Sequence, residues 1–363
     1  MKFLLKHVFS FIIKSILSIV LLLAIYIGGC ILIAKLTEFK PLPVQKLDLI
    51  APNPSCTEQI PADSTLRFMT WNIGYGGLGA ETDFFYDGGS MSVVPKEWVK
   101  KYTNGIYETV KEHQNNDFFF FQEVDRKGWR SHNTDEVSGI SESLPKHGAV
   151  FALNYDVKYL PMPWFKPLGR VYGGLLSCSK YAPQTSERIA LPNIEDFPRK
   201  LFYLKRCLIV QRYDVSNGKQ LVAINAHLEA YDEGGKVKKQ QMEVLRELMQ
   251  KEYAKGNYVV LGGDWNIAPP KFNIHKWEKE KVADPLYQLQ NDSVFISGWS
   301  YVADLNTPTN RKDNHKYDSN TTYTTVIDYF YVSPNIHVKW VKGVNSGFRF
   351  SDHNPVEMEI KLY

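Results

Sequence analysis

Several signatures that quickly classify a protein are missing from this 363-residue sequence. Its four cysteines contain no C-x-x-C pair, which argues against a zinc site, and no internal repeat or low-complexity tract is visible. Basic and acidic residues nearly balance, at 43 and 39, so the composition does not mark a dedicated polyanion binder. The apolar share of 44% is enough for a substantial core, in one large domain or two ordinary ones.

A long apolar run lies close to the N-terminus. Residues 15–34 carry no charged side chain, and a helix of about 20 residues spans the hydrocarbon core of a membrane. The preceding segment, residues 1–14, is basic and contains Lys2, Lys6 and Lys14. We predict a single-pass transmembrane anchor at 15–34, and the distribution of lysines favours an extracytoplasmic position for the rest of the chain.

Other interpretations of this segment remain open. A buried core helix is a poor match for a charge-free segment flanked by lysines, and no A-x-A-like site indicates a cleaved signal peptide. Residues 27–30 (Ile-Gly-Gly-Cys) resemble a bacterial lipobox, in which Cys30 becomes the lipidated N-terminus of a lipoprotein. The apolar residues 31–34 differ from the polar tether that usually follows such a site. Either anchor would attach the remaining chain to a membrane.

The following segment, residues 35–64, is predicted to be an extended linker. Five prolines lie between Thr37 and Asp63, and the segment has little periodicity. The folded domain is then expected to cover residues 65–363. Within it, Cys178 and Cys207 both lie in strand-like runs, and the sequence leaves open whether they pair.

The clearest strand of this domain begins at Tyr258 and leads directly into polar side chains. Its apolar, β-branched start predicts a strand buried on both faces. Gly262 and Gly263 remove side-chain bulk where the strand ends, so that backbone or ligand can approach closely. Asp264 and Asn266 follow, and a carboxylate and an amide at a strand end suit a divalent cation and a phosphate. A capping Asp and a turn Asn are the structural alternative.

Other predicted strands also end in, or carry, polar side chains. These side chains are Asn72, Glu123, Asn225 with His227, Asp328, and Asp352 with His353. Apolar residues at three- and four-residue spacing predict helices at 97–113 and 236–254, between strands, as is typical of an α/β protein. Because ligands collect outside strand ends in layered sheets, we expect these polar side chains to form one site.

An aromatic and proline-rich stretch covers residues 155–172 and includes Tyr159, Trp164 and Phe165. The density of prolines excludes a regular helix, so the stretch is predicted to form a loop or hairpin. Such aromatic residues commonly cover the rim of a core. In a protein tethered to a membrane they would also suit contact with the lipid interface or stacking on bases.

The polar strand ends form motifs in a defined order. They are Trp-Asn-Ile at 71–73, Gln-Glu-Val at 122–124, Asn-Ala-His-Leu at 225–228, Gly-Asp-Trp-Asn at 263–266, Ile-Asp-Tyr at 327–329 and Ser-Asp-His-Asn-Pro at 351–355. This series resembles the endonuclease/exonuclease/phosphatase superfamily, which includes deoxyribonuclease I, neutral sphingomyelinases and inositol polyphosphate 5-phosphatases. The resemblance covers roughly residues 65–363.

The resemblance implies an α/β fold, a four-layer sandwich of two mixed β-sheets flanked by helices. It also implies hydrolysis of a phosphoester with Mg²⁺ as cofactor and Mn²⁺ as an alternative. The metal ligands it implies are Glu123, Asn72 and Asp352. In the catalytic roles that it implies, Asp264 orients or deprotonates the attacking water, and Asn266 positions the water and the phosphate. His227 and His353 contact the phosphoryl oxygens, and Asp328 holds His353 in one tautomer. The substrate contacts expected with it are Asn72, Asn225 and Arg311, the last from a phosphate-facing turn at 309–311 for which an ordinary surface loop is the alternative.

The chemistry of a phosphodiester calls for these residue types independently of the family. The negative charge of the diester repels a nucleophile, and further charge builds on its oxygens in the transition state. A cation together with imidazole and amide donors stabilises that charge, and losing one donor typically costs about 3 kcal/mol. Mg²⁺ keeps several waters and takes only one or two carboxylates, which fits Glu123 with more distant helpers.

The substrate is predicted from the anchor and from the motif at 225–227. This Asn-x-His pattern resembles the sphingomyelinase, 5-phosphatase and deoxyribonuclease branches, whereas abasic-site endonucleases usually carry a different motif there. The membrane tether and the aromatic stretch favour a phospholipid headgroup, as in a sphingomyelinase-like phosphodiesterase. A membrane-tethered nuclease of the deoxyribonuclease I type and a non-catalytic binding module on the same fold are the alternatives. The sequence indicates no protein partner.

Overall fold

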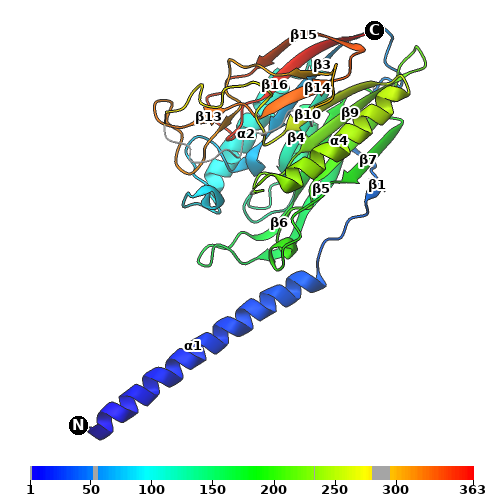
Figure 1. The fold of residues 1–363 in the computed structure, drawn as a ribbon. Coiled ribbons are helices and arrows are strands. Elements are labelled where there is room, and N and C mark those ends of the chain that lie inside the picture. The colour runs from blue at the N-terminus through cyan, green and yellow to red at the C-terminus, as the bar shows by residue number, and fades with distance from the viewer. Residues whose placement is uncertain (1, 52–55, 233, 280–294) are drawn as a thin grey trace.

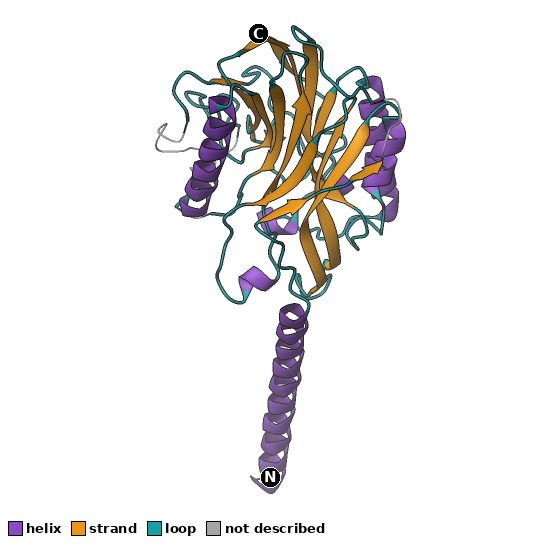
Figure 2. Ribbon diagram, turned by 90° about the vertical axis from the view of Figure 1, so that its right-hand side faces the viewer, coloured by secondary structure: helices purple, strands orange, loops and turns teal. Residues whose placement is uncertain are grey.

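The computed structural model describes residues 2–51, 56–232, 234–279 and 295–363. A long helix, α1 (Lys2–Leu36), projects from a domain in which two β-sheets lie face to face (Figures 1 and 2). The end of α1 that adjoins the domain lies near the hairpin of β5 (Gly148–Leu160) and β6 (Gly169–Ser179) (Figure 1).

Each of the two large sheets has seven strands in the described part of the chain. The first sheet has the order β1 (Val44–Lys46), β7 (Thr185–Ala190), β8 (Cys207–Asp214), β9 (Gln220–His227), β10 (Tyr258–Asp264), β14 (Asp328–Val332) and β11 (Ser300–Val302). The second has the order β15 (Ile336–Gly343), β16 (Val356–Leu362), β3 (Thr65–Asn72), β4 (Phe118–Asp125), β6, β5 and β2 (Leu49–Ala51). Both sheets are mixed, because β9 and β10 are parallel, β3 and β4 are parallel, and the other pairs are antiparallel.

Helices cover the outer faces of the two sheets (Figure 2). The helix α4 (Lys236–Ala254) packs on the first sheet through Met242, Leu245 and Met249, which lie on one face because they are three and four residues apart. On the second sheet lie α2 (Lys96–Glu112) and α3 (Glu136–Ser143), whose buried residues share a cluster with β3 and β4. The predicted four-layer α/β sandwich of two mixed sheets is therefore confirmed.

The core between the sheets is rich in phenylalanine. Phe68 and Phe120 of the second sheet and Phe330 of the first share one buried cluster, and the rings of Phe68 and Phe330 meet edge to face with their centroids 6.3 Å apart. Burying one such side chain typically contributes about 1.5–3 kcal/mol. This packing fixes the position of one sheet relative to the other, and with it the relation between strand ends that come from different sheets.

Within the segment predicted to be a linker, residues 35–64, the helix α1 ends at Leu36, and parts of 37–51 and 56–64 pack on the folded domain. Strand β1 pairs with β7 at the edge of the first sheet, and β2 pairs with β5 at the edge of the second. Ile60 is fully buried in the core between the sheets. The segment thus leads from α1 onto both sheets. Strands of three residues are too short to produce a periodic pattern, which explains why the sequence indicated only an extended chain.

The helix α1 is one continuous helix, longer than the predicted anchor of 15–34, and it includes most of the basic segment 1–14. Its residues Phe3–Leu36 are long and apolar enough to span a membrane. Near its C-terminal end, Cys30 and Ala34 are buried against the domain, whereas most of the helix is exposed.

All four cysteines are free thiols. Cys178 lies in β6 of the second sheet and Cys207 begins β8 of the first. The pairing that the sequence left open is therefore absent.

The end of β10 depends on a glycine. Gly263 has φ 149°, and a Cβ built on it would lie 1.9 Å from the carbonyl oxygen of Ala226 in β9.

We predict that Gly263→Ala destabilises the protein by about 3 kcal/mol, because neither backbone can move without disturbing the sheet. Thermal or denaturant unfolding measures this effect. Gly77→Ala is the matched control, since its Cβ would meet no atom nearer than 3.8 Å. Equal stability of the two variants would contradict the close approach of β9 and β10.

Candidate active site

The polar ends of β3, β4, β9 and β10 meet at one end of the sandwich. Asp264 ends β10 and stands opposite His227 of parallel β9 on one side and Asp328 of antiparallel β14 on the other. In the second sheet, Asn72 stands opposite Gln122, so that Glu123 follows at the same level. The carboxyl ends of parallel strands share one sheet edge, and the packing of the two sheets brings both edges together.

A cleft of about 1360 Å³ opens at this end of the sandwich. Its lining includes the predicted residues Glu123, His227, Asp264, Asn266, Asp352 and His353. Asn72 lies beneath them and donates a hydrogen bond of 2.9 Å from Nδ2 to Oδ2 of Asp264. Residues from five separate segments of the chain thus form one site.

Asp264 is held in place from several directions. Besides Asn72, the backbone N–H of Asn266 donates to its Oδ1 at 2.9 Å, and Nε2 of His227 lies 3.3 Å from its Oδ2. Asn266 has φ 49°, a backbone conformation that asparagine tolerates better than most residues. The carboxylate therefore has a fixed orientation, although it is almost completely buried.

His353 forms a buried dyad with Asp328. Its Nδ1 and Oδ2 of Asp328 are 2.8 Å apart, and its Nε2 lies 3.7 Å from both Asp264 and Asp352. Burial by itself would lower the pKa of His353, but the carboxylates of Asp328, Asp352 and Asp264 outweigh it and raise the pKa well above its usual value. These carboxylates thus favour the imidazolium form of His353, whose Nε2 lies at the cleft.

The pKa of His227 shifts in the opposite direction. Burial lowers the pKa of His227 well below its usual value, and the charges of Arg206 and His353 add to the effect. Its Nε2 lies 3.8 Å from Oε1 of Glu123. The pKa values of the two histidines thus shift in opposite directions, because burial and nearby positive charges dominate at His227 and three carboxylates dominate at His353.

Glu123 occupies an irregular position in β4. The pairing of β4 with β6 is interrupted between Phe121 and Val124, and Glu123 has φ 55°, which is rare for a residue other than glycine. Such bulges re-aim side chains next to functional sites. Burial, followed by repulsion from Asp352, raises the pKa of Glu123 to about 8, even though Arg130 opposes the shift.

The donor set suits a divalent cation. Glu123 is partly exposed and Asp352 is buried, and neither accepts a hydrogen bond from a basic side chain among the described residues. Crowded carboxylates with so little access to water gain stability from a cationic partner. Ligand-capable atoms of Asp264, Asp328 and His353 also lie within 4.8 Å of one another. Because Asp328 and Asp264 are already engaged by His353 and Asn72, we regard Glu123 and Asp352 as the better-placed metal ligands.

The Endonuclease/Exonuclease/phosphatase family matches residues 69–353, which include every residue of the site described above. The chain belongs to this family. Its members include nucleases, phosphatases and phosphodiesterases, and they are generally hydrolytic phosphoesterases. A search of curated proteins finds no match.

Solved structures with the same fold come from several organisms. An endonuclease/exonuclease/phosphatase from Beutenbergia cavernae is 18% identical with a TM-score of 0.55, over 82% of this chain and 72% of that one. One from Bacteroides vulgatus is 16% identical with a TM-score of 0.53, over 83% and 100%. The catalytic domain of human Nocturnin, solved with bound sulfate, is 17% identical with a TM-score of 0.52, over 87% and 98%. At these identities the similarity shows the fold alone.

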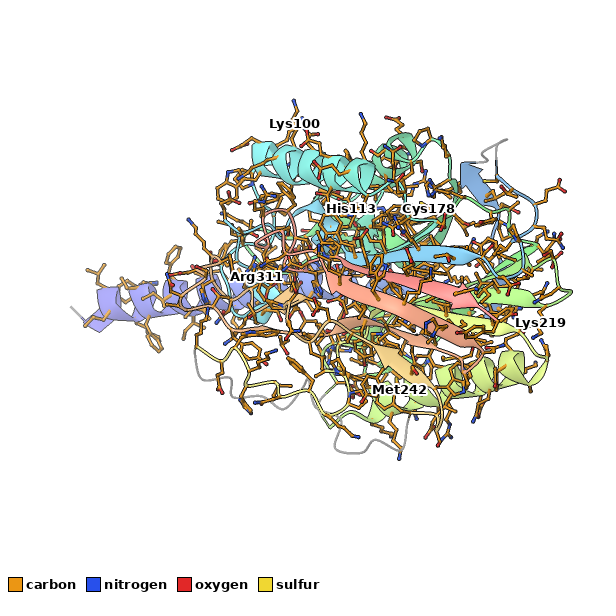
Figure 3. All side chains as sticks on the ribbon, turned by 90° about the horizontal axis from the view of Figure 1, so that it is seen from above. Lys100, His113, Cys178, Lys219, Met242 and Arg311 are labelled. Atoms are coloured by element: carbon orange, nitrogen blue, oxygen red, sulfur yellow. The ribbon has the colours of Figure 1, made fainter. Side chains whose placement is uncertain are left out.

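The two remaining predicted substrate contacts differ in their position relative to the cleft. Asn225 is fully buried between the sheets, where its Nδ2 donates to the carbonyl oxygens of Phe121 and Leu176. Arg311 belongs to β12 (Asn310–Arg311), which pairs with β13 (Thr324–Thr325), and it lines the cleft toward the α1 side of the domain (Figure 3). Its two terminal nitrogens donate to the carbonyl oxygens of residues 78, 79, 82, 312 and 315. The role of Arg311 as a substrate contact therefore stays a prediction.

Asn310, the other residue of β12, also lines the cleft. Its side-chain amide lies 3.1 Å from Nε2 of His353, and Asn310 forms a bridge with His353 in the backbone. The turn at 309–311 therefore reaches the site, and it brings Asn310, which the sequence pattern did not single out, next to His353.

No sequence pattern indicated a second group of acids, which lies beside the site. Asp87 and Asp313 both line the cleft, and the hydroxyl of Tyr231 donates to Asp87 at 2.9 Å. Burial raises the pKa of Asp87 to about 6. Asp87 ends the three-residue helix η2 (Phe85–Asp87) and Asp313 lies in a loop, and neither place has a periodic pattern that would mark them.

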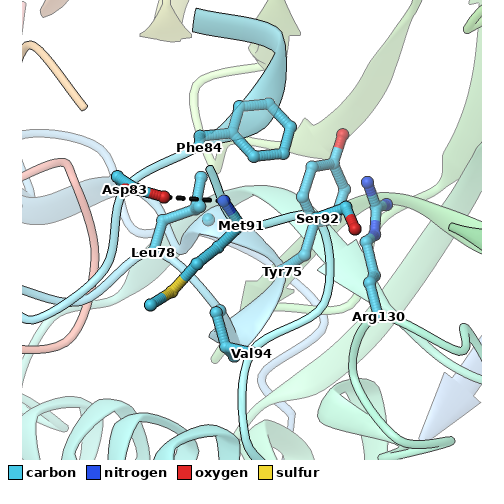
Figure 4. Close-up of a pocket in the computed structure, with 10 residues that line it drawn as sticks. Tyr75, Leu78, Asp83, Phe84, Met91, Ser92, Val94 and Arg130 are labelled. Atoms are coloured by element: carbon cyan, nitrogen blue, oxygen red, sulfur yellow. Dashed lines mark hydrogen bonds between the residues drawn. The ribbon is translucent and has the colours of Figure 1, made fainter. Parts of the chain in front are cut away.

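A small pocket borders the cleft below the loop that follows β3 (Figure 4). The guanidinium of Arg130 lies over the ring of Tyr75, 3.1 Å from its centroid, and is also paired with Asp125 at 2.8 Å. The backbone N–H of Met91 donates to Asp83 on the other side of this pocket. Arg130 thus places a fixed positive charge near Glu123 without contacting it directly.

We predict that the pKa of His353 depends on Asp328, which can be measured without an enzyme assay. In Asp328→Asn the largest favourable charge on His353 is lost while its burial remains, so the pKa of His353 should fall by at least one unit. Titration of the imidazole NMR signals, assigned with His353→Gln, measures this change. Glu247→Gln, at an exposed position of α4, is the control that should leave the midpoint unaltered. An unchanged midpoint in Asp328→Asn would mean that the dyad does not set the charge of His353.

Proposed function

We propose that this protein is a membrane-anchored phosphodiesterase that hydrolyses the phosphodiester of a phospholipid headgroup with a divalent cation, Mg²⁺ or Mn²⁺. Membership of the family supports hydrolysis of a phosphoester. The observation that carries the narrower proposal is the cleft, because it extends from the polar strand ends to side chains of α1.

Glu123 and Asp352 would hold the cation, with the side-chain oxygen of Asn72 close by. The Nδ2 of Asn72 is bonded to Asp264 and its Oδ1 accepts from the backbone N–H of Gly74, so the amide has a fixed orientation and keeps one acceptor site. This set matches the preference of Mg²⁺ for one or two carboxylates and several waters. When bound, the cation would neutralise charge that develops on the phosphoryl oxygens.

Asp264 is the residue best placed to orient the attacking water and accept its proton. Its two oxygens are positioned by Asn72 and by the backbone of Asn266, so the carboxylate does not need to reorganise when a water binds. His353 would donate from Nε2 to a phosphoryl oxygen, because its Nδ1 is engaged by Asp328. His227 would provide a neutral donor on the other side.

A lipid suits the remainder of the cleft better than a nucleic acid. Leu160, Met162 and Trp164 line it together with residues of α1. A strand of nucleic acid is instead held by a continuous basic groove with stacking aromatic residues. With α1 as a membrane anchor, the lysine distribution around it favours a domain on the extracytoplasmic side.

The full-length protein in phospholipid vesicles that contain sphingomyelin or phosphatidylinositol tests this proposal. We expect Mg²⁺-dependent release of the headgroup, and loss of that activity with EDTA. Glu123→Gln and His353→Ala should each lower turnover by about 10²–10³-fold, because each removes a group that acts on the developing charge. His337→Ala, at an exposed position of β15, should retain wild-type turnover.

Plasmid DNA and a soluble phosphodiester are offered in parallel. Nicking of the plasmid without headgroup release would replace the lipid proposal with a nuclease. No turnover of any substrate by the folded wild-type protein would contradict an enzymatic function and leave a binding module.

A further inference from the structure

The C-terminal part of α1 is attached to the domain through one face. Tyr26, Cys30 and Ala34 are four residues apart and therefore lie on the same side of the helix. The hydroxyls of Tyr26 and Tyr159 share a hydrogen bond of 3.2 Å, and the rings of Tyr26 and Trp164 are 6.1 Å apart. The helix is thus seated against the end of the β5–β6 hairpin.

The same turns of the helix form part of the wall of the cleft. Tyr26, Ile27, Cys30 and Ile31 line the cleft that contains the polar strand ends. The apolar residues Leu160, Met162, Trp164, Leu168 and Phe202 also line it. At about 1360 Å³ the cleft exceeds the usual 300–1000 Å³ of small-molecule sites, and its character changes from apolar at α1 to charged at the catalytic residues.

The position of these residues along the helix sets their depth in a membrane. If the charge-free residues 15–34 span the hydrocarbon core, then residues 26–34 occupy about its last 12 Å. Because Tyr26 contacts Tyr159 and Trp164, the end of the β5–β6 hairpin would then lie within this last part of the hydrocarbon core. In the loop between these two strands, Phe165 is 98% exposed and Trp164 is 49% exposed, and Phe197, just before the short helix η3 (Arg199–Leu201), is 64% exposed. Such exposure is unfavourable in water and favourable in lipid.

We propose that α1 is part of the substrate site as well as an anchor: Tyr26, Ile27, Cys30 and Ile31 form a groove for the acyl chain of a phospholipid from the same leaflet. The phosphodiester then reaches the polar strand ends while the chain remains beside the helix. This inference rests on the proposed function, and it adds that the substrate is taken laterally from the membrane. Uptake of a phospholipid would also explain why the cleft has both apolar and charged lining residues.

Two tryptophan substitutions in α1 test whether an acyl chain occupies the groove. Cys30→Trp introduces a large side chain into the groove, whereas Leu32→Trp places the same side chain on a face that is 56% exposed. Full-length proteins in vesicles are compared on a long-chain phospholipid and on bis(p-nitrophenyl) phosphate. We expect the ratio of lipid turnover to soluble turnover to fall at least tenfold in Cys30→Trp and to remain within twofold of wild type in Leu32→Trp. An unchanged ratio in Cys30→Trp would overturn the inference.

A binding measurement separates this inference from the proposed function. A phospholipid with a photoreactive acyl chain is cross-linked to each protein in vesicles, and the labelled peptides are mapped. We expect labelling at residues 202–204, which line the cleft, in wild type and Leu32→Trp, and at least a fivefold loss in Cys30→Trp. This pattern without turnover of any substrate would refute the enzymatic function and support the groove. Equal labelling in all three proteins, or none in wild type, would refute the groove.

Discussion

The crowding of carboxylates out of water is the constraint on which this structure depends. Glu123, Asp264 and Asp352 come from both sheets and meet at one end of the sandwich. Buried charges are unfavourable unless they are paired, and here only Asp264 has a full set of hydrogen-bond donors. The raised pKa of Glu123 is the direct consequence. Crowded acids of this kind lower the stability of a fold, and their presence here supports the cation and phosphate site proposed above.

The sheets, rather than the loops, provide the precision of this site. Gly263 allows β9 and β10 to approach closely, and the register of these strands sets His227 beside Asp264. The bulge at Glu123 turns its side chain toward the same point. A strained backbone and a tight glycine contact are both features that only a well-packed core can maintain.

The part of the site that lies at the ends of long strands could be predicted from the sequence. Asn72 and Asp264 follow apolar runs, and such runs indicate both a strand and its end. Asn225 and Arg311 could not be placed in this way, because the face to which a side chain points depends on register and on a turn of two residues. The short strands β1 and β2 were missed for a similar reason, since their pairing partners are distant in the sequence and their length gives no pattern.

The helix α1 contacts the domain at the end of the β5–β6 hairpin. Tyr26 contacts Tyr159 and Trp164, and the turns of α1 that include Tyr26 and Cys30 line the same cleft as the polar strand ends. A helix that is joined to the rest of the chain by its end alone would lack this contact. With the proposed function, the arrangement would bring the membrane anchor and the substrate site together.

The most direct test of the central claim is the binding of Mn²⁺ to the full-length protein, followed by electron paramagnetic resonance in the absence of substrate. The account predicts saturable binding that is weakened at least tenfold by Glu123→Gln and is unaffected by His337→Ala. Binding of equal affinity in wild type and Glu123→Gln would show that these carboxylates do not gather around a cation, and would contradict the account.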